Sequence, residues 1–259
     1  VYNALNPPYS KWVEQFPRLQ AGTIAAAEAN DAKLVVMENV YMYGDMQGKP
    51  MTEDTPYNPH TKKGRLRSRM SRELLTAHEQ GRVRVVVGRA ADFIGPRVMQ
   101  SALGGDLVLK NVVADKSAQL IGDIDQPHAY TYMPDIGRAL VTLAQHDDAL
   151  GQVWHLPTAP AISTREYLQR LYDAAGQPMR FSVAPKLLLR VVGIFSPDTG
   201  EVVEMLYQFE SPFILDDSKF VRRFGWGATD IDTVARQTVA WFQAQQKADA
   251  TKQTAIPQT

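Results

Sequence analysis

Short apolar runs alternate along the chain with segments whose apolar residues recur every three or four positions. Each run has the length and composition of a strand that is buried on both faces. Such strands are predicted at 33–37, 83–87 and 152–156. Amphipathic helices are predicted at 19–30, 66–81, 134–146, 163–175 and about 229–245. Strand, crossover helix and strand form the unit of a parallel sheet, so we expect an α/β fold.

The pattern becomes mixed after Pro96. Further short strands are predicted at 128–133, 181–184 and 213–215, and a further helix at 187–195. Ser163 and Gly176 are residue types that begin and end a helix. The tail 246–259 is polar and is predicted to be disordered.

Charge and composition argue against several classes of function. Lys plus Arg number 28 and Asp plus Glu number 28, so nothing favours binding to nucleic acid or to an anionic membrane. The chain has no cysteine, which excludes disulfides and Cys-ligated zinc, and no metal site is predicted. No apolar run approaches the roughly 18 residues of a membrane helix. Residues 1–8 lack the basic start and apolar core of a signal peptide, so we expect a cytoplasmic protein.

Four segments carry motifs in a fixed order. Residues 35–44 end in Asn-Val-Tyr-Met-Tyr-Gly, 53–59 contain Glu-Asp-Thr-Pro, 63–67 read Lys-Gly-Arg-Leu-Arg, and 88–96 read Gly-Arg-Ala-Ala-Asp-Phe-Ile-Gly-Pro. These segments are similar, respectively, to Ser-Ser-x-x-Val-Tyr-Gly, an acidic-Pro loop, Tyr-Gly-x-Ser-Lys and Arg-x-x-Asn-x-Tyr-Gly-Pro. Through them the chain resembles the extended short-chain dehydrogenase/reductase family, of the NAD-dependent epimerase/dehydratase type.

The resemblance implies a Rossmann-like doubly wound parallel sheet with a smaller mixed α/β substrate lobe. Residues 1–100 and about 127–160 would form the dinucleotide-binding part, and 101–126 with 161–245 the lobe. NAD or NADP is the implied cofactor. None of the 17 glycines lies in the family's Gly-x-x-Gly-x-x-Gly loop, and residues 1–4 match the end of its fourth strand. We therefore expect a longer polypeptide, because half of such a sheet would expose an edge and an apolar face.

The catalytic positions differ from those of the family, in which a Tyr is the general acid/base, a Lys lowers its pKa, and a Ser or Thr binds the substrate oxygen. Matched residue by residue, Asn39 takes the Ser position, Lys63 the Tyr position and Arg67 the Lys position. A register shifted by two residues places Arg65 and Arg69 there instead. Lys can act as an acid/base if its pKa is lowered, whereas Arg cannot.

Ligands of open α/β sheets bind outside the carboxyl ends of the strands, and the segments after 33–37 and 83–87 reach the same rim. Lys63 lies three residues before Leu66, so it shares the helix stripe that faces the sheet if the helix begins early enough to include it. The predicted catalytic residues are Asn39, Tyr41, Lys63 and Arg67, whereas Tyr43 is expected to pack in the interior. The alternative is that the basic run 62–72 is a solvated helix face and that Asn39 only forms a turn.

Two further groups of site residues follow from the resemblance. The predicted cofactor-binding residues are Asn3, Ala4, Arg89 and Ala91. The predicted substrate-binding residues are Asp92, Phe93 and Tyr132. Alternatively, Asp92 caps the turn before Gly95 and does not contact a ligand. His155 lies at the end of a predicted strand and is expected to be a core histidine.

The resulting hypothesis is an NAD(P)-dependent oxidoreductase, epimerase or dehydratase that acts on a small polar carbonyl or sugar-like molecule. The first alternative is a non-catalytic nucleotide-sensing or partner-binding protein that kept the fold and lost the Tyr–Lys pair. The second is catalysis without a cofactor by the region of Lys63 and Tyr41. A small-molecule ligand and a homodimer are the expected partners.

Overall fold

The computed structural model describes residues 1–99, 101, 103, 107–185 and 203–254. Its main sheet has four parallel strands in the order β1-β2-β3-β8. The strands are β1 (Tyr2–Asn3), β2 (Leu34–Glu38), β3 (Val85–Arg89) and β8 (Val153–His155). The prediction that the three apolar runs form parallel strands of one sheet is confirmed, and the fold is α/β with a Rossmann-like sheet.

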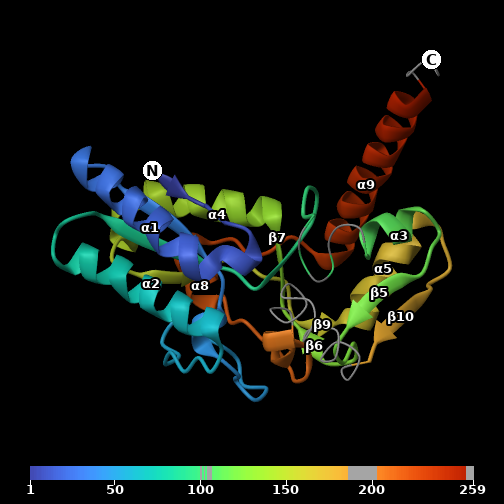
Figure 1. Cartoon of the computed structure of the whole chain (residues 1–259), viewed down its shortest axis with the longest axis horizontal. Helices are drawn as coiled ribbons and strands as arrows, with labels where there is room; N and C mark the ends of the chain where they lie inside the picture. The colour runs from blue at the N-terminus through green and yellow to red at the C-terminus, as the bar shows by residue number, and fades with distance from the viewer. Residues whose placement is uncertain (100, 102, 104–106, 186–202, 255–259) are drawn as a thin grey trace.

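Helices cover both faces of this sheet (Figure 1). On one face, α1 (Trp12–Ala29) and α2 (Lys62–Glu79) pack with Leu34, Val36, Val85 and Val87. On the other face, α4 (Met133–Gln145) and α8 (Ser218–Phe224) pack with Val35 and Val86. Successive residues of a strand point to opposite faces, which explains why these strands are apolar throughout.

Helix α1 begins at Trp12, seven residues before the predicted start. The cause is a small aromatic core in which Trp12 and Phe16 pack on Leu66 and Met70 of α2. In addition, the side-chain amide of Gln20 donates to the Met70 carbonyl at 2.9 Å. The first turns of α1 are therefore held by α2.

A second group of elements surrounds its own core. Two parallel strands, β5 (Ala118–Ile121) and β10 (Phe181–Ala184), lie with α3 (Leu109–Val113), α5 (Thr164–Ala175) and α9 (Ile231–Thr254), away from the main sheet (Figure 1). A capping box between Ser163 and Glu166 starts α5, and Gly176 ends it with φ of 69°. Assignment of these elements to a substrate lobe stays a prediction.

Two short pairs of strands complete the fold. β4 (Asp92–Ile94) pairs in parallel with β7 (Tyr130–Tyr132), and β6 (Pro127–His128) pairs with β9 (Ile162–Ser163) in antiparallel fashion. The predicted strand 128–133 is thus divided. The predicted strand 213–215 makes only isolated bridges, Phe213 with His128 and Leu215 with Met51.

The sequence predicts disorder for residues 246–259. For residues 246–254 this prediction is wrong, because α9 continues to Thr254. Figure 1 shows this end of α9 projecting from the body of the molecule. Residues 255–259 and the predicted helix 187–195 lie outside the described residues. Within the described part of the chain, no helix is both long and apolar enough to cross a membrane.

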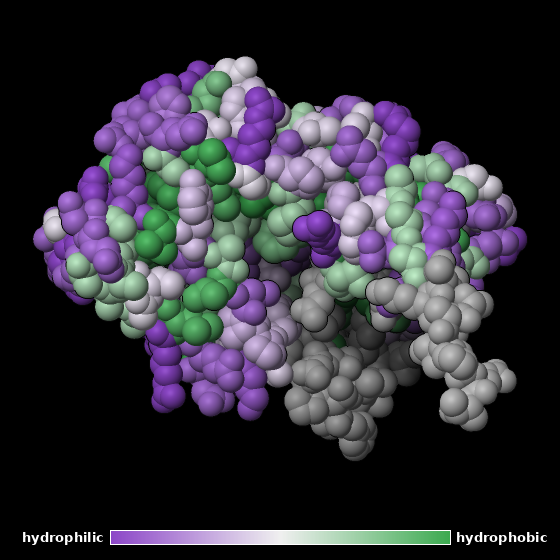
Figure 2. All heavy atoms as spheres, turned by 90° about the horizontal axis from the view of Figure 1, so that it is seen from above, coloured by the Kyte–Doolittle hydropathy of each residue, from purple (hydrophilic) through white to green (hydrophobic). Residues whose placement is uncertain are grey.

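Strand β1 is an edge of the main sheet, and several large apolar side chains near it are exposed. They are Val1, Tyr2, Leu5 and Val13. On the face of the molecule that Figure 2 shows, hydrophobic residues gather in green on the left part. Among the described residues, no strand pairs with the outer edge of β1.

Candidate functional site

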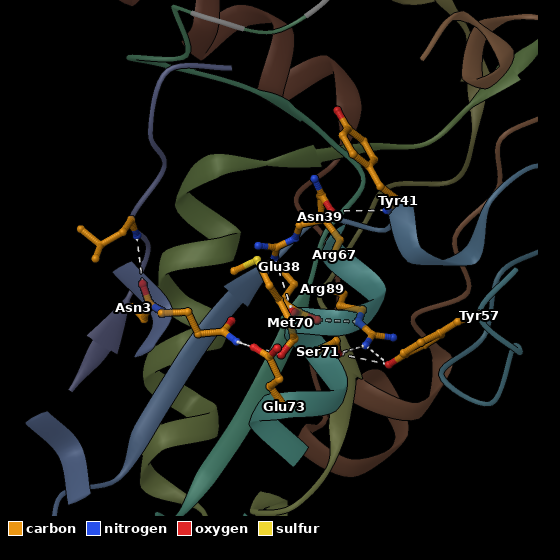
Figure 3. A network of polar contacts seen from close by, with 12 residues as sticks. Asn3, Glu38, Asn39, Tyr41, Tyr57, Arg67, Met70, Ser71, Glu73 and Arg89 are labelled. Carbon is orange, nitrogen blue, oxygen red and sulfur yellow. Dashed lines mark hydrogen bonds and ion pairs between the residues drawn. The ribbon is translucent and has the colours of Figure 1, made fainter. Parts of the chain in front are cut away.

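The carboxyl end of β2 leads into a turn that carries Tyr41. The side-chain oxygen of Asn39 accepts a hydrogen bond from the Tyr41 backbone N–H at 3.3 Å. A 3-10 turn follows, η2 (Tyr41–Tyr43), which packs against the start of α2. Asn39 therefore shapes the turn, in agreement with its alternative role, and it remains half-buried at the rim (Figure 3).

Lys63 lies in the first turn of α2, directly behind this loop. Thr61 caps the helix, its hydroxyl accepting from the Gly64 backbone N–H at 3.0 Å. A Cβ on Gly64 would lie 2.7 Å from the Tyr41 carbonyl oxygen, so glycine allows helix and loop to approach this closely. The Lys63 side chain is only 1% exposed, and its Nζ lies 4.1 Å from the centre of the Tyr9 ring.

The environment of Lys63 lowers the pKa of its amine below the ordinary value. Burial is the main cause, and Glu204 opposes it. Neighbouring cations of the basic run, Lys62, Arg65 and Arg69, are exposed. The solvated-face interpretation therefore holds for those three residues and fails for Lys63 and Arg67, which are buried.

Three half-buried tyrosines, Tyr9, Tyr41 and Tyr207, form what we call the tyrosine cluster. Tyr207 belongs to the turn η4 (Leu206–Phe209). Burial raises the pKa of all three phenols, that of Tyr207 to about 12, and the negative charge of Asp92 raises them further. Asp92 begins β4 (Asp92–Ile94) three residues after β3 ends, and Tyr41 follows the end of the neighbouring strand β2 by three residues, so both leave the same edge of the sheet.

Beneath the rim lies a buried ion cluster of one carboxylate and two guanidinium groups (Figure 3). Arg89 Nε lies 3.1 Å from Glu38 Oε2, and Arg67 Nη2 lies 3.5 Å from Glu38 Oε1. All three side chains are at most 4% exposed. Arg67 also stacks on the Phe16 ring, 4.8 Å from its centre, and its Nε has no hydrogen-bond partner among the described residues.

Arg89 is wholly buried, and its other donors are engaged inside the protein. They reach Tyr43 Oη at 2.7 Å, Ser71 Oγ at 2.6 Å and the Tyr57 hydroxyl. Arg89 thus forms the floor of the site and presents no exposed surface to a cofactor. The prediction that Tyr43 packs in the interior is confirmed.

The interpretation of His155 as a core histidine is also confirmed, because the residue is fully buried. Its Nε2 lies 2.7 Å from the Tyr43 hydroxyl, and its Nδ1 lies 2.9 Å from the Asp216 carbonyl oxygen. Burial lowers the pKa of His155 to about 3, so the ring is neutral at physiological pH.

The other predicted site residues divide between the rim and the two cores. Asn3 is buried, with its amide donating to Thr23 and accepting from the Leu5 N–H, whereas Ala4 is exposed. Ala91 is buried and donates its N–H to Thr131 at 3.0 Å. Phe93 packs against the core beneath α4.

Tyr132 belongs to the core of the second group of elements. Its hydroxyl donates to Gln237 of α9. The structure thus brings Asn39, Tyr41, Lys63 and Asp92 to one rim, with Arg67 beneath it, and gives Phe93 and Tyr132 packing contacts elsewhere.

Asp92 has a partner that the sequence pattern did not reveal. Its Oδ2 lies 2.8 Å from Nε2 of His128, a residue 36 positions away. Tyr9, Tyr207 and Glu204 were missed for the same reason, since their proximity depends on chain segments that no local pattern brings together.

The sequence model of the NAD dependent epimerase/dehydratase family matches residues 19–156 of this chain. The chain belongs to this family. Among solved structures, it is similar to UDP-glucuronic acid 4-epimerase from Bacillus cereus in complex with UDP-glucuronic acid and NAD. Identity is 15% and the TM-score 0.74, covering 93% of this chain and 74% of that one.

Two further solved structures are similar over comparable lengths. One is DesIV, a dTDP-glucose 4,6-dehydratase from Streptomyces venezuelae, as a double mutant with NAD and DAU bound (15% identity, TM-score 0.72, 95% of this chain and 73% of that chain). The other is RMD from Pseudomonas aeruginosa complexed with NADPH (15% identity, TM-score 0.68, 93% and 80%). No curated protein matches the sequence. At this identity the structural likeness shows the fold alone.

Proposed function

We propose that this chain provides the reaction site of an NAD(P)-dependent oxidoreductase, epimerase or dehydratase, with Lys63 as its acid/base. The substrate would be a small polar carbonyl compound or a sugar-like molecule. The observation that carries the proposal is the place of Lys63: it is buried in the first turn of α2, over the Tyr9 ring and behind the Tyr41 loop. By the motif resemblance, this is the position of the family's catalytic Tyr.

The chemistry of a lysine suits this position. A neutral amine accepts a proton from a substrate hydroxyl, and an ammonium group donates one to a carbonyl oxygen. The lowered pKa of Lys63 brings these two forms closer in free energy at neutral pH than they are for a lysine in water. Arg67 keeps its proton and supplies a fixed positive charge below the rim.

A nicotinamide cofactor would supply the hydride chemistry. Asn39 and Lys63 would face its reacting end, at the carboxyl edge of the sheet. Arg67 supports the fit, because its Nε is a buried donor without a hydrogen-bond partner among the described residues, which a hydroxyl or phosphate oxygen could satisfy.

The alternative is a protein that senses a nucleotide and has no turnover. What favours it is the replacement of the family's Tyr and Lys by Lys63 and Arg67. In that case the tyrosine cluster and Lys63 would bind a ligand without transforming it. The proposed homodimer and the cytoplasmic location stay predictions under either function.

The two functions differ in what removal of the Lys63 amine does. With the full natural polypeptide, NADH and NADPH oxidation is measured against a panel of hydroxy-aldehydes, hydroxy-ketones and nucleotide sugars. Lys63→Met should lower turnover by about 100-fold or more, the usual size of a general acid/base contribution. Lys62→Met, which alters an exposed neighbour, is the control.

Equal turnover by the two variants would refute the role of Lys63. Absence of turnover by the wild-type protein, together with nucleotide binding by calorimetry that Lys63→Met weakens, would favour the sensing function.

A further inference from the structure

Asp92 and His128 form a pair that the proposed function has not used. Their side chains meet at 2.8 Å, Asp92 Oδ2 to His128 Nε2. An ionised carboxylate only accepts hydrogen bonds, so His128 Nε2 carries the hydrogen and donates it. The His128 side chain is 2% exposed, whereas that of Asp92 is 20% exposed. The histidine is therefore the buried support, and the carboxylate is the group that reaches the surface of the site.

Aromatic rings fix the orientation of His128. Its ring stacks on Phe209 with centres 4.7 Å apart and planes 3° apart, and on Phe213 with centres 4.9 Å apart and planes 20° apart. A third ring, that of Tyr130, lies 4.8 Å away. Rings on this many sides leave the imidazole little freedom to rotate, so the donor stays aimed at Asp92.

The backbone places Asp92 at the rim of the sheet. It is the first residue of β4 and lies three positions after the end of β3, as Tyr41 lies three positions after the end of β2. Strands β2 and β3 are neighbours, so the two segments leave the same edge. The Ala91 N–H donates to Thr131, which holds β4 against β7. The effect of the Asp92 charge on the tyrosine cluster agrees with this position.

Lys63 lies over the Tyr9 ring from α2, and Asp92 begins β4 at the same edge of the sheet. Their charges are opposite, and the tyrosines contribute hydroxyl groups. If a substrate spans the two, a carboxylate on one side with a cation and hydroxyl groups on the other is suited to remove a proton from a carbon next to a carbonyl group, because the charge that develops on the carbonyl oxygen is stabilised.

We propose that Asp92 is a second proton-transfer group of this site, that it acts on a substrate carbon adjacent to a carbonyl, and that His128 is its positioning residue. This inference rests on the proposed function, of which it names one chemical step. The Cα–H bond breaks and the proton passes to an Asp92 oxygen. The electron pair of that bond forms the C=C bond of an enolate, and the carbonyl π pair moves onto oxygen, towards Lys63 and Tyr41. Return of the proton to carbon restores the carbonyl compound, so no oxidant or reductant is consumed.

The test uses this proton exchange in the absence of nicotinamide. The full natural protein is incubated in D2O with dihydroxyacetone, glyceraldehyde and related C3 to C6 hydroxy-carbonyl compounds, and NMR follows deuterium entering the carbon beside the carbonyl. Wild-type protein should accelerate exchange of at least one probe over buffer. Asp92→Asn should reduce the rate by about 100-fold or more. Asp92→Glu, which keeps a carboxylate, should retain more of it, and Asp54→Asn, at an exposed loop carboxylate, should have no effect.

Variants of His128 separate positioning from packing. His128→Phe keeps a ring between Phe209 and Phe213 and removes the donor, whereas His128→Gln restores an N–H donor. The expected result is a fall in kcat of exchange at unchanged KM for His128→Phe, with partial recovery in His128→Gln. Melting curves show that each variant is folded.

Three results would overturn the inference: no exchange above buffer by the wild-type protein, equal exchange by Asp92→Asn, or equal exchange by His128→Phe. Exchange by a protein that shows no NAD(P)H turnover would uphold the inference and refute only the NAD(P)-linked reaction.

Discussion

The buried ion cluster beneath the site gives a prediction for Glu38→Gln. In the wild-type protein the Glu38 carboxylate lies between Arg89, at 3.1 Å, and Arg67, at 3.5 Å. The substitution keeps the size of the side chain and removes its negative charge. Two guanidinium groups, each at most 4% exposed, would then remain without a carboxylate among their described contacts.

The size of the effect follows from the burial of the cluster. Removing one partner from a buried ion pair costs about 3 to 5 kcal/mol, because the remaining charge stays desolvated. The Gln amide oxygen can still accept one hydrogen bond, so we expect the lower end, about 3 kcal/mol. For a protein of this size, 1 kcal/mol shifts the melting temperature by about 2 to 4 °C, which gives a fall of about 6 to 12 °C.

Urea unfolding followed by tryptophan fluorescence measures this loss. Trp12 is a local reporter, because its ring lies 5.2 Å from that of Phe16, on which Arg67 stacks. Glu28→Gln is the matched control, since Glu28 forms an exposed pair with Arg82 and its loss should change stability little. If Glu38→Gln and Glu28→Gln unfold at the same urea concentration, the cluster is not a stabilising pair and the floor of the site has been misinterpreted.

Two other predictions concern the residues that frame Lys63 and Tyr43. Gly64→Ala should lower the free energy of unfolding by about 1 to 3 kcal/mol, although Ala has the higher helix propensity. The reason is that its Cβ would lie 2.7 Å from both Pro59 Cβ and the Tyr41 carbonyl oxygen. A variant that is more stable in urea unfolding would contradict this tight contact. Burial lowers the pKa of His155 from 6.5 to about 3, so the unfolded chain takes up a proton before the folded one does. The contribution of His155 to the free energy of unfolding is complete above pH 6.5 and should fall by about 4 kcal/mol as the pH drops to 3. Acid unfolding of His155→Gln should lack this loss. Identical acid unfolding of the two proteins would show that His155 is accessible to protons.

The sequence was sufficient for the main sheet because its strands are apolar on both faces. Runs such as 33–37 and 83–87 can only be buried between layers of helices, and they are. The helix that carries Lys63 was predictable for a similar reason, since its apolar residues recur with the helical period. The same period puts Lys63 on the buried stripe only if the helix starts before Leu66, and in the structure α2 starts at Lys62.

Other features depended on contacts that a local pattern does not contain. The first turns of α1 form because Trp12 and Phe16 pack on α2, which begins 50 residues after Trp12. The strand predicted at 213–215 has the right composition but finds only single bridging partners. Likewise, His128 gave no signal of its own, because its role comes from Asp92 and from two rings far along the chain, Phe209 and Phe213.

Arg89 illustrates how a motif position can be found while its contacts remain hidden. The resemblance predicted a cofactor-binding residue at the end of β3. In the structure four groups inside the protein, Glu38, Tyr43, Tyr57 and Ser71, take up its donors. The sequence could not reveal this, because these partners come from three separate segments of the chain.

The central claim is that Lys63 is an acid/base whose pKa the site lowers, and titration of its amine tests this claim most directly. The amine is followed by NMR in protein labelled with 15N and 13C in lysine, and its signal is assigned by its loss in Lys63→Met. Because burial of Lys63 is the main influence, the midpoint should lie below the ordinary value of 10.5. A midpoint at or above 10.5 would show an amine held in its charged form, and it would contradict the role of Lys63 as the acid/base of this site.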